Sequence, residues 1–106
     1  MRKLYISEKL VGKIRSLADS FREPYKKLLG ELAFLMEVSR NIVAREPKSL
    51  RNIIFLIEDL GRTIAKINLI MEVVDSKMPN TLREKISKVL NILSEKRNKL
   101  IDFIVR

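Results

Sequence analysis

The chain has 106 residues, carries 22 Lys and Arg against 13 Asp and Glu, and has a formal net charge of +9 at pH 7. Its length fits one domain over residues 1–106, and 46% hydrophobic with 33% charged residues is the composition of a globular chain. Cys, His, Trp and Gln are absent, which excludes disulfides and thiolate metal sites and leads us to expect a reducing, cytoplasmic compartment.

The first residues predict neither a signal peptide nor a membrane anchor. Arg2 and Lys3 are basic, but Glu8 and Lys9 interrupt any apolar core of a signal peptide. An uninterrupted apolar run such as Ile53–Ile57 is far too short to cross a bilayer. Thirteen Ile residues and abundant Lys and Glu resemble the usage of thermophile proteins, although an AT-rich genome produces the same bias.

Three prolines divide the chain into four segments with helical periodicity. Pro24, Pro47 and Pro79 each precede a long periodic stretch, and proline is tolerated in the first turn of a helix, where its missing N–H needs no partner. The residue before a proline is driven out of the helical region, so each proline also ends the preceding helix. We therefore expect helices over residues 7–22, 24–45, 48–76 and 81–105.

The first two segments each have one apolar face. In the first, Ser7 is a candidate N-cap, and Leu10, Ile14 and Phe21 recur at helical steps. The second repeats this pattern from Tyr25 to Val43. Each of these helices therefore has one stripe to bury in a core.

The third segment is apolar on two sides. Its main stripe begins at Ile53 and ends at Val74, and other apolar residues point roughly the opposite way. A helix of this kind needs two partners, and the second segment also places apolar residues away from its core face. We expect these residues to form the interface of a homodimer: Phe34, Val38, Phe55, Leu69, Ile70 and Val73.

The fourth segment completes an all-α fold. Thr81 and Glu84 have the spacing of a capping box, and an apolar stripe extends from Leu82 to Ile104. Short connections force neighbouring helices to be antiparallel, so we expect an up-down-up-down four-helix bundle. In that arrangement the first and fourth helices are neighbours.

Catalytic chemistry has little support in the residues. Without His or Cys, the commonest general base, nucleophile and transition-metal ligands are missing, and no glycine-rich phosphate loop occurs. Glu72 and Asp75 show the Glu-x-x-Asp spacing that all-α nucleotide pyrophosphatases use, but the partnering Glu-x-x-Glu pair is absent. We expect these acids to pair with Lys or Arg, and we expect a protein that is not an enzyme and has no metal or cofactor.

The surplus of positive charge lies at the two ends of the sequence. Residues 1–22 hold six Lys and Arg against two acids, and residues 78–106 hold seven against three. Residues 23–46 are balanced at four against four, and residues 47–77 hold five against four. The first and fourth helices are expected to be neighbours, and the handedness of the bundle decides whether their lysine flanks face the same side. If they do, these lysines are candidates to bind nucleic acid: Lys9, Lys13, Lys85, Lys88, Lys96 and Lys99.

These lysines predict binding to the phosphate backbone of DNA or RNA without strong sequence readout. The Lys ammonium group is a point charge, whereas the planar guanidinium group of Arg can form two parallel hydrogen bonds. No sequence-reading motif occurs in the chain. Arg2, Lys3 and Tyr5 could extend the surface, with Tyr5 stacking on bases. Three alternatives remain: a solvated flank that covers apolar surface, attraction to an anionic membrane, and a helical protein-interaction module with no nucleic-acid role.

Overall fold

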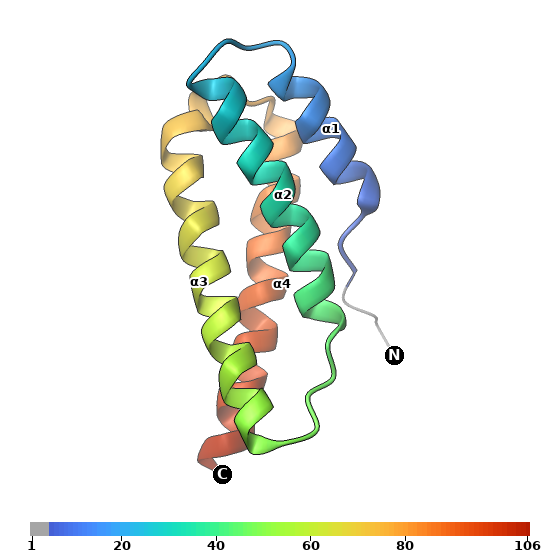
Figure 1. The fold of residues 1–106 in the computed structure, drawn as a ribbon, viewed down its shortest axis with the longest axis vertical. Helices are drawn as coiled ribbons and strands as arrows, with labels where there is room; N and C mark the ends of the chain where they lie inside the picture. The colour runs from blue at the N-terminus through green and yellow to red at the C-terminus, as the bar shows by residue number, and fades with distance from the viewer. Residues whose placement is uncertain (1–4) are drawn as a thin grey trace.

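The computed structural model describes residues 5–106, and these fold into four α-helices and one short 3-10 helix. The bounds are α1 Glu8–Ala18, α2 Tyr25–Ala44, α3 Leu50–Val74, η1 Asp75–Lys77 and α4 Asn80–Val105. The all-α prediction is confirmed, and no strand occurs in residues 5–106. Figure 1 shows the helices packed alongside one another in an elongated bundle of 47 × 27 × 18 Å.

The prolines mark the helix starts as expected, with differences in detail. Pro24 and Pro79 occupy the N-cap positions of α2 and α4. The capping box expected at Thr81 does not form, because α4 already begins at Asn80 and its N-cap, Pro79, has no side-chain acceptor. Ser7 caps α1, where its hydroxyl accepts a hydrogen bond from the Lys9 N–H at 3.2 Å.

The first and third helices are shorter than predicted. The expected helix 7–22 ends at Ala18, because the chain tightens into turns in which Ser20 N–H and Phe21 N–H donate to carbonyls three residues earlier. The expected helix 48–76 begins at Leu50, where the Ser49 hydroxyl accepts from Asn52 N–H at 3.2 Å. It changes to 3-10 geometry at Asp75, which pairs with Arg83 at 3.3 Å as expected, whereas Glu72 takes part in no ion pair within residues 5–106.

The predicted apolar faces meet in one core to which all four helices contribute. The largest apolar side chains that are fully buried come from all four helices: Ile14, Leu29, Leu32, Met36, Leu60, Ile67, Val74, Ile86 and Leu93. Two buried hydroxyls, of Ser39 and Thr63, donate to the carbonyls four residues earlier, at 2.7 and 2.8 Å. Each of these two hydroxyls is therefore satisfied within its own helix, whereas the buried Nε of Arg97 has no hydrogen-bond partner within residues 5–106.

The four helices are not equal partners. At 11 residues, α1 is less than half as long as α3 and α4, and it packs mainly against α2 while touching α4 along a shorter stretch. In Figure 1 α1 lies beside only one end of α2. None of the helices in residues 5–106 is long and apolar enough to cross a membrane.

Glycines inside two of these helices predict a difference in stability that can be measured. A Cβ at Gly30 would meet no atom within 4 Å, whereas a Cβ at Gly61 would lie 3.3 Å from Nε of Arg97. Gly30→Ala should therefore raise the free energy of unfolding by about 1 kcal/mol. Gly61→Ala should gain clearly less or lose stability, because the Arg97 side chain must shift.

Urea denaturation of the two variants checks this contrast. An equal gain at both positions would contradict the close packing of Arg97 on Gly61.

Candidate functional site

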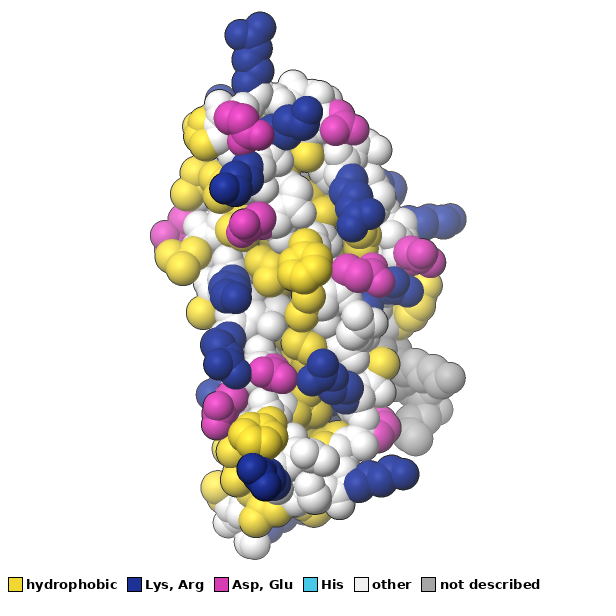
Figure 2. Space-filling view, viewed as in Figure 1, with side chains coloured by type: hydrophobic (Ala, Val, Ile, Leu, Met, Phe, Trp, Pro, Cys, Tyr) yellow, Lys and Arg dark blue, Asp and Glu magenta, His cyan; other side chains and the backbone are white. Residues whose placement is uncertain are grey.

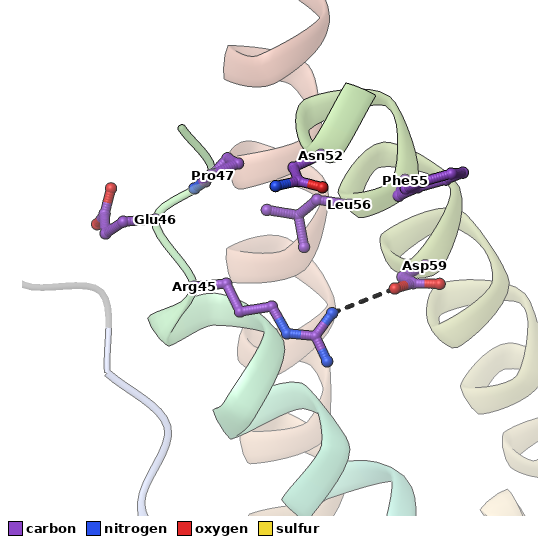
Figure 3. Close-up of a pocket in the computed structure, with 7 residues that line it drawn as sticks. All are labelled: Arg45, Glu46, Pro47, Asn52, Phe55, Leu56 and Asp59. Carbon is purple, nitrogen blue, oxygen red and sulfur yellow. Dashed lines mark hydrogen bonds and ion pairs between the residues drawn. The ribbon is translucent and has the colours of Figure 1, made fainter. Parts of the chain in front are cut away.

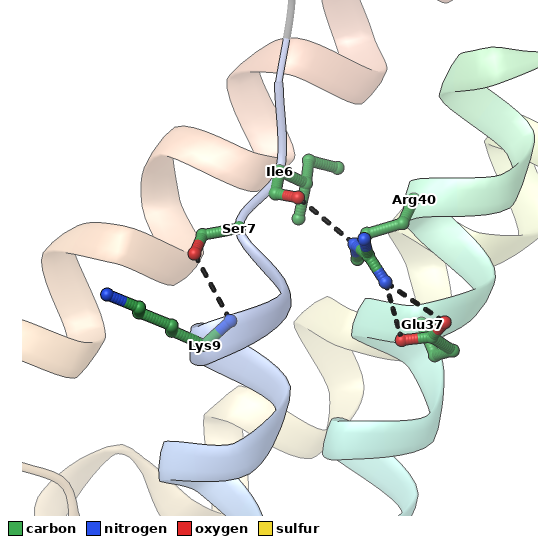
Figure 4. A network of polar contacts seen from close by, with 5 residues as sticks. All are labelled: Ile6, Ser7, Lys9, Glu37 and Arg40. Carbon is green, nitrogen blue, oxygen red and sulfur yellow. Dashed lines mark hydrogen bonds and ion pairs between the residues drawn. The ribbon is translucent and has the colours of Figure 1, made fainter.

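The segment before α1 is tied down by α2. Arg40, on α2, donates from Nε to the Ile6 carbonyl at 3.1 Å and from Nη1 to both carboxylate oxygens of Glu37 at 3.1 Å. Ile6 itself is buried. Figure 4 shows this network, with the Lys9 side chain directed away from Arg40 toward α4. The start of α1 is thus held in a defined orientation between α2 and α4.

The apolar face of α1 determines where its lysines lie. Leu10, Val11 and Ile14 are buried, so Lys9 and Lys13 emerge one residue before these core positions on the flank of the helix. On α4, Leu82, Ile86 and Val89 are likewise buried, and Lys85 and Lys88 each precede a buried residue. Because each of the four lysines comes directly before a buried residue, they lie on the same side of the α1–α4 contact.

We call these four residues, Lys9, Lys13, Lys85 and Lys88, the lysine cluster. They line two adjoining hollows between α1 and α4, a shallow groove of about 770 Å³ and a smaller cleft of about 220 Å³. Lys9, Lys13 and Lys85 border both hollows, and Lys88 borders the cleft together with Tyr5. Two helices separated by more than sixty residues thus contribute to one basic surface.

The proximity of the lysines changes the acid–base chemistry of Lys85. Its pKa lies below the ordinary lysine value, first because its amine is in hydrogen-bonding contact range of the Lys13 amine, which is also a donor, and then because the Lys13 charge opposes its protonation. Desolvation and the charges of Lys88 and Lys9 act in the same direction. Two ammonium groups both donate and neither accepts, so this contact disfavours the charged form of Lys85.

Within residues 5–106, no carboxylate forms an ion pair with the lysine cluster. The ion pairs within residues 5–106 join Arg40 with Glu37, Arg45 and Arg62 with Asp59, Arg83 with Asp75, and Lys99 with Glu95. None of them includes a residue of the cluster. The positive charge there is therefore available to an external anion.

The other two candidate lysines lie elsewhere. Lys96 donates from Nζ to the carbonyls of Val43 and Arg45, both at 2.7 Å, and so satisfies the C-terminal end of α2. Burial lowers its pKa, and the Glu46 carboxylate partly opposes this effect. Lys99 pairs with Glu95 at 3.5 Å along its own helix. Arg2 and Lys3 lie outside the described residues.

Sequence reasoning missed other residues that line the groove beside the lysines, among them a glycine and two residues with hydroxyl groups. Gly12 and Ser16 of α1 and Thr81 at the start of α4 border it. A Cβ at Gly12 would meet no atom within 4 Å, so no neighbouring residue requires a glycine there. The one sequence feature that could have drawn attention to this part of α1 is a glycine in the middle of a helix. A glycine at such a position does not by itself predict a groove.

The predicted dimer residues lie mostly on the face of α2 and α3. Phe34, Phe55, Leu69 and Val73 are exposed, and Val38 is half-buried. Ile70 is only 8% exposed and belongs to the core, because it lies between the two apolar sides of α3 and borders α2. Figure 2 shows a hydrophobic strip down the middle of this face, with Lys, Arg, Asp and Glu on both sides.

A further cavity, of about 540 Å³, lies where α2 connects to α3. Figure 3 shows Asn52 and Leu56 pointing from α3 toward Pro47, while Arg45 reaches from the end of α2 to Asp59 at 3.2 Å. Asp59 also accepts from Arg62 at 3.0 Å, so its charge is already balanced. Within residues 5–106, no three acidic side chains gather where they could hold a metal ion.

Comparisons with known proteins add no relative. No protein-family model matches the chain, and neither the curated proteins nor the solved structures contain a match to it. A function must therefore be inferred from the geometry described above.

The different surroundings of Lys96 and Lys99 predict different effects of removing their charges. Lys96→Gln should lower the free energy of unfolding by about 1 to 2 kcal/mol, because two carbonyls at the end of α2 lose a charged donor. Lys99→Gln makes the same change in net charge and should alter stability by less than about 0.5 kcal/mol. Chemical denaturation of both variants measures the difference, and equal losses would contradict the capping role of Lys96.

Removing a lysine from the cluster should stabilise the protein. Below the lowered pKa of Lys85 its charge is repelled by its neighbours, so Lys85→Gln should melt at a higher temperature than the wild type at pH 7 in low salt. At pH values between the lowered pKa and the ordinary value of about 10.4, Lys85 is more protonated in the unfolded chain than in the folded one. The free energy of unfolding of the wild type therefore rises with pH in this range.

The difference in melting temperature between Lys85→Gln and the wild type should therefore shrink as the pH rises toward about 10.4, and it should also shrink at high salt. Thermal unfolding followed by circular dichroism measures both dependences. Lys26→Gln, which removes an exposed lysine of α2, is the control. A lower melting temperature for Lys85→Gln than for the wild type at pH 7 would show that the cluster is not repulsive.

Proposed function

We propose that this protein is a small non-enzymatic binding protein that holds nucleic acid by its phosphate backbone in the groove between α1 and α4. One observation carries the proposal. The fold gathers Lys9, Lys13, Lys85 and Lys88 from two distant segments into one surface and supplies no carboxylate to balance them within residues 5–106.

A polyanion suits this surface better than a single small anion does. The cluster lines two adjoining open hollows rather than one enclosed pocket, so successive charges along a strand can each meet a lysine. Binding releases counterions from the strand, which supplies most of the affinity of non-specific complexes. Each bound phosphate also relieves the repulsion that lowers the pKa of Lys85.

The residues of the groove favour backbone contact over reading of bases. Lysine ammonium groups bind phosphate as point charges, whereas base edges are read by planar side chains such as Arg, Asn and Gln. Ser16 and Thr81 add hydroxyl donors that also suit phosphate. Tyr5, exposed at the edge of the cleft, is the one aromatic side chain there that can stack on an unpaired base.

The proposal assumes that successive helices are antiparallel, in an up-down-up-down arrangement, as their short connections imply. It also takes the protein to act in the cytoplasm, without a metal or an organic cofactor. Both DNA and RNA present the same phosphate charge, so the proposal includes both.

A second candidate function is a helical module that binds protein and has no nucleic-acid role. The observation that favours it is the exposed apolar strip on α2 and α3, which includes Phe34 and Leu69. The two functions use different faces of the bundle. Salt-dependent binding to nucleic acid distinguishes them, because only the lysine cluster predicts it.

Fluorescence anisotropy with labelled duplex and single-stranded probes tests the proposal. The logarithm of the association constant should fall linearly with the logarithm of salt concentration. The double variant Lys13→Gln, Lys85→Gln should reduce the slope by about 1.4 to 1.8, which corresponds to two lost phosphate contacts. The control double variant Lys26→Gln, Lys27→Gln has the same net charge as the first double variant and should keep the wild-type slope.

A pair of glycine variants tests the location without changing charge. Gly12→Leu places a side chain in the groove, whereas Gly30→Leu places one on α2 at a position that is equally free of neighbours. Only Gly12→Leu should weaken binding. The proposal fails if the wild type binds no nucleic acid at about 50 mM salt, or if the control lysines matter as much as the cluster.

A further inference from the structure

The groove between α2 and α3 has an apolar floor and exposed apolar walls. It encloses about 610 Å³ and is lined by Glu31, Phe34, Leu35, Lys66, Leu69 and Ile70. Leu35 and Ile70 are buried, whereas Phe34 and Leu69 are 62% and 64% exposed. Exposed apolar side chains beside one groove on neighbouring helices form a patch of the kind that marks an interface.

The charge of this face permits contact between two copies of the chain. Residues 23–46, which include α2, hold equal numbers of basic and acidic residues, and residues 47–77, which include α3, carry only one extra positive charge. Two copies that met through their lysine clusters would instead bring together the most positive parts of both molecules. A highly basic protein can therefore self-associate through α2 and α3 with the least repulsion.

The charged residues at the groove complement each other. Glu31 lies on α2 and Lys66 on α3, and neither takes part in an ion pair within residues 5–106. A two-fold axis that passes between them exchanges their positions. Glu31 of one protomer then faces Lys66 of the partner subunit, and the same contact occurs a second time.

From these observations we infer that the α2–α3 face binds a second copy of this chain around a two-fold axis. Phe34 and Leu69 of both protomers become buried at the centre, and the two Glu31–Lys66 contacts lie at the edge, an arrangement of apolar centre and charged rim that is common at interfaces. This inference does not depend on the lysine cluster, so its test is independent of nucleic-acid binding.

Sedimentation equilibrium of matched variants tests the inference. The wild type should dimerise, and Phe34→Glu should weaken dimerisation by about thirtyfold or more, as expected at the centre of an interface. Phe103→Glu makes the same change at a phenylalanine of α4 that is 66% exposed, and it should leave dimerisation unchanged. Both side chains are largely exposed, so circular dichroism should show a folded protein in each case.

Charge reversal tests the orientation of the two copies. Glu31→Lys raises the net charge and Lys66→Glu lowers it, yet each should weaken the dimer because it places like charges opposite each other. The double variant has the wild-type net charge and should recover the affinity.

Three outcomes would overturn the inference. The first is a wild type that remains monomeric at its highest soluble concentration. The second is a dimer that dissociates with Phe103→Glu but not with Phe34→Glu. The third is a double charge-reversal variant that dimerises no better than the two single variants.

Discussion

The burial of the apolar face of α1 is the constraint on which the rest of this structure depends. Leu10, Val11 and Ile14 must leave water, and only the side of α2 and α4 offers them an apolar surface. Each side chain of this size stabilises the fold by about 1.5 to 3 kcal/mol when it is fully buried. The repulsion between exposed ammonium groups is screened by water and salt, so burial prevails and the lysines are carried together.

The lysine cluster is therefore a consequence of core packing, which brings the four lysines together even though their charges repel one another. A fold selected for stability alone gains nothing from Lys13 beside Lys85, because their contact lowers the pKa of Lys85 and no acid compensates for it within residues 5–106. Local conflicts of this kind are expected at functional or strained sites. Lys96 shows the opposite case, since the carbonyls of Val43 and Arg45 use its charge within the fold.

The bundle separates two kinds of surface by the lengths of its helices. Because α1 is short, it borders α4 only along the stretch that holds the lysine cluster. The opposite pair, α2 and α3, presents a nearly neutral face with a hydrophobic strip (Figure 2). A strand bound at the first surface and a second copy bound at the other would not compete for the same residues.

Much of the fold followed from the sequence. The three prolines and the apolar periodicity predicted four helices, and Ser7 was identified as a cap, because these signals act within a few residues. The ends of α1 and α3 were predicted less well. Phe21 illustrates why: it continues the apolar pattern, but it packs near Tyr25 from a turn, with ring centroids 6.3 Å apart, rather than from the helix.

Of the candidate site, the sequence by itself determined which helices carry the surplus lysines and on which flank of the apolar stripe each one lies. Only the tertiary structure decided that Lys9, Lys13, Lys85 and Lys88 share one groove, that Lys96 turns to the end of α2, and that Ile70 is buried. The physical reason is that periodicity specifies a direction around one helix axis. Which neighbour lies in that direction depends on how all four helices pack.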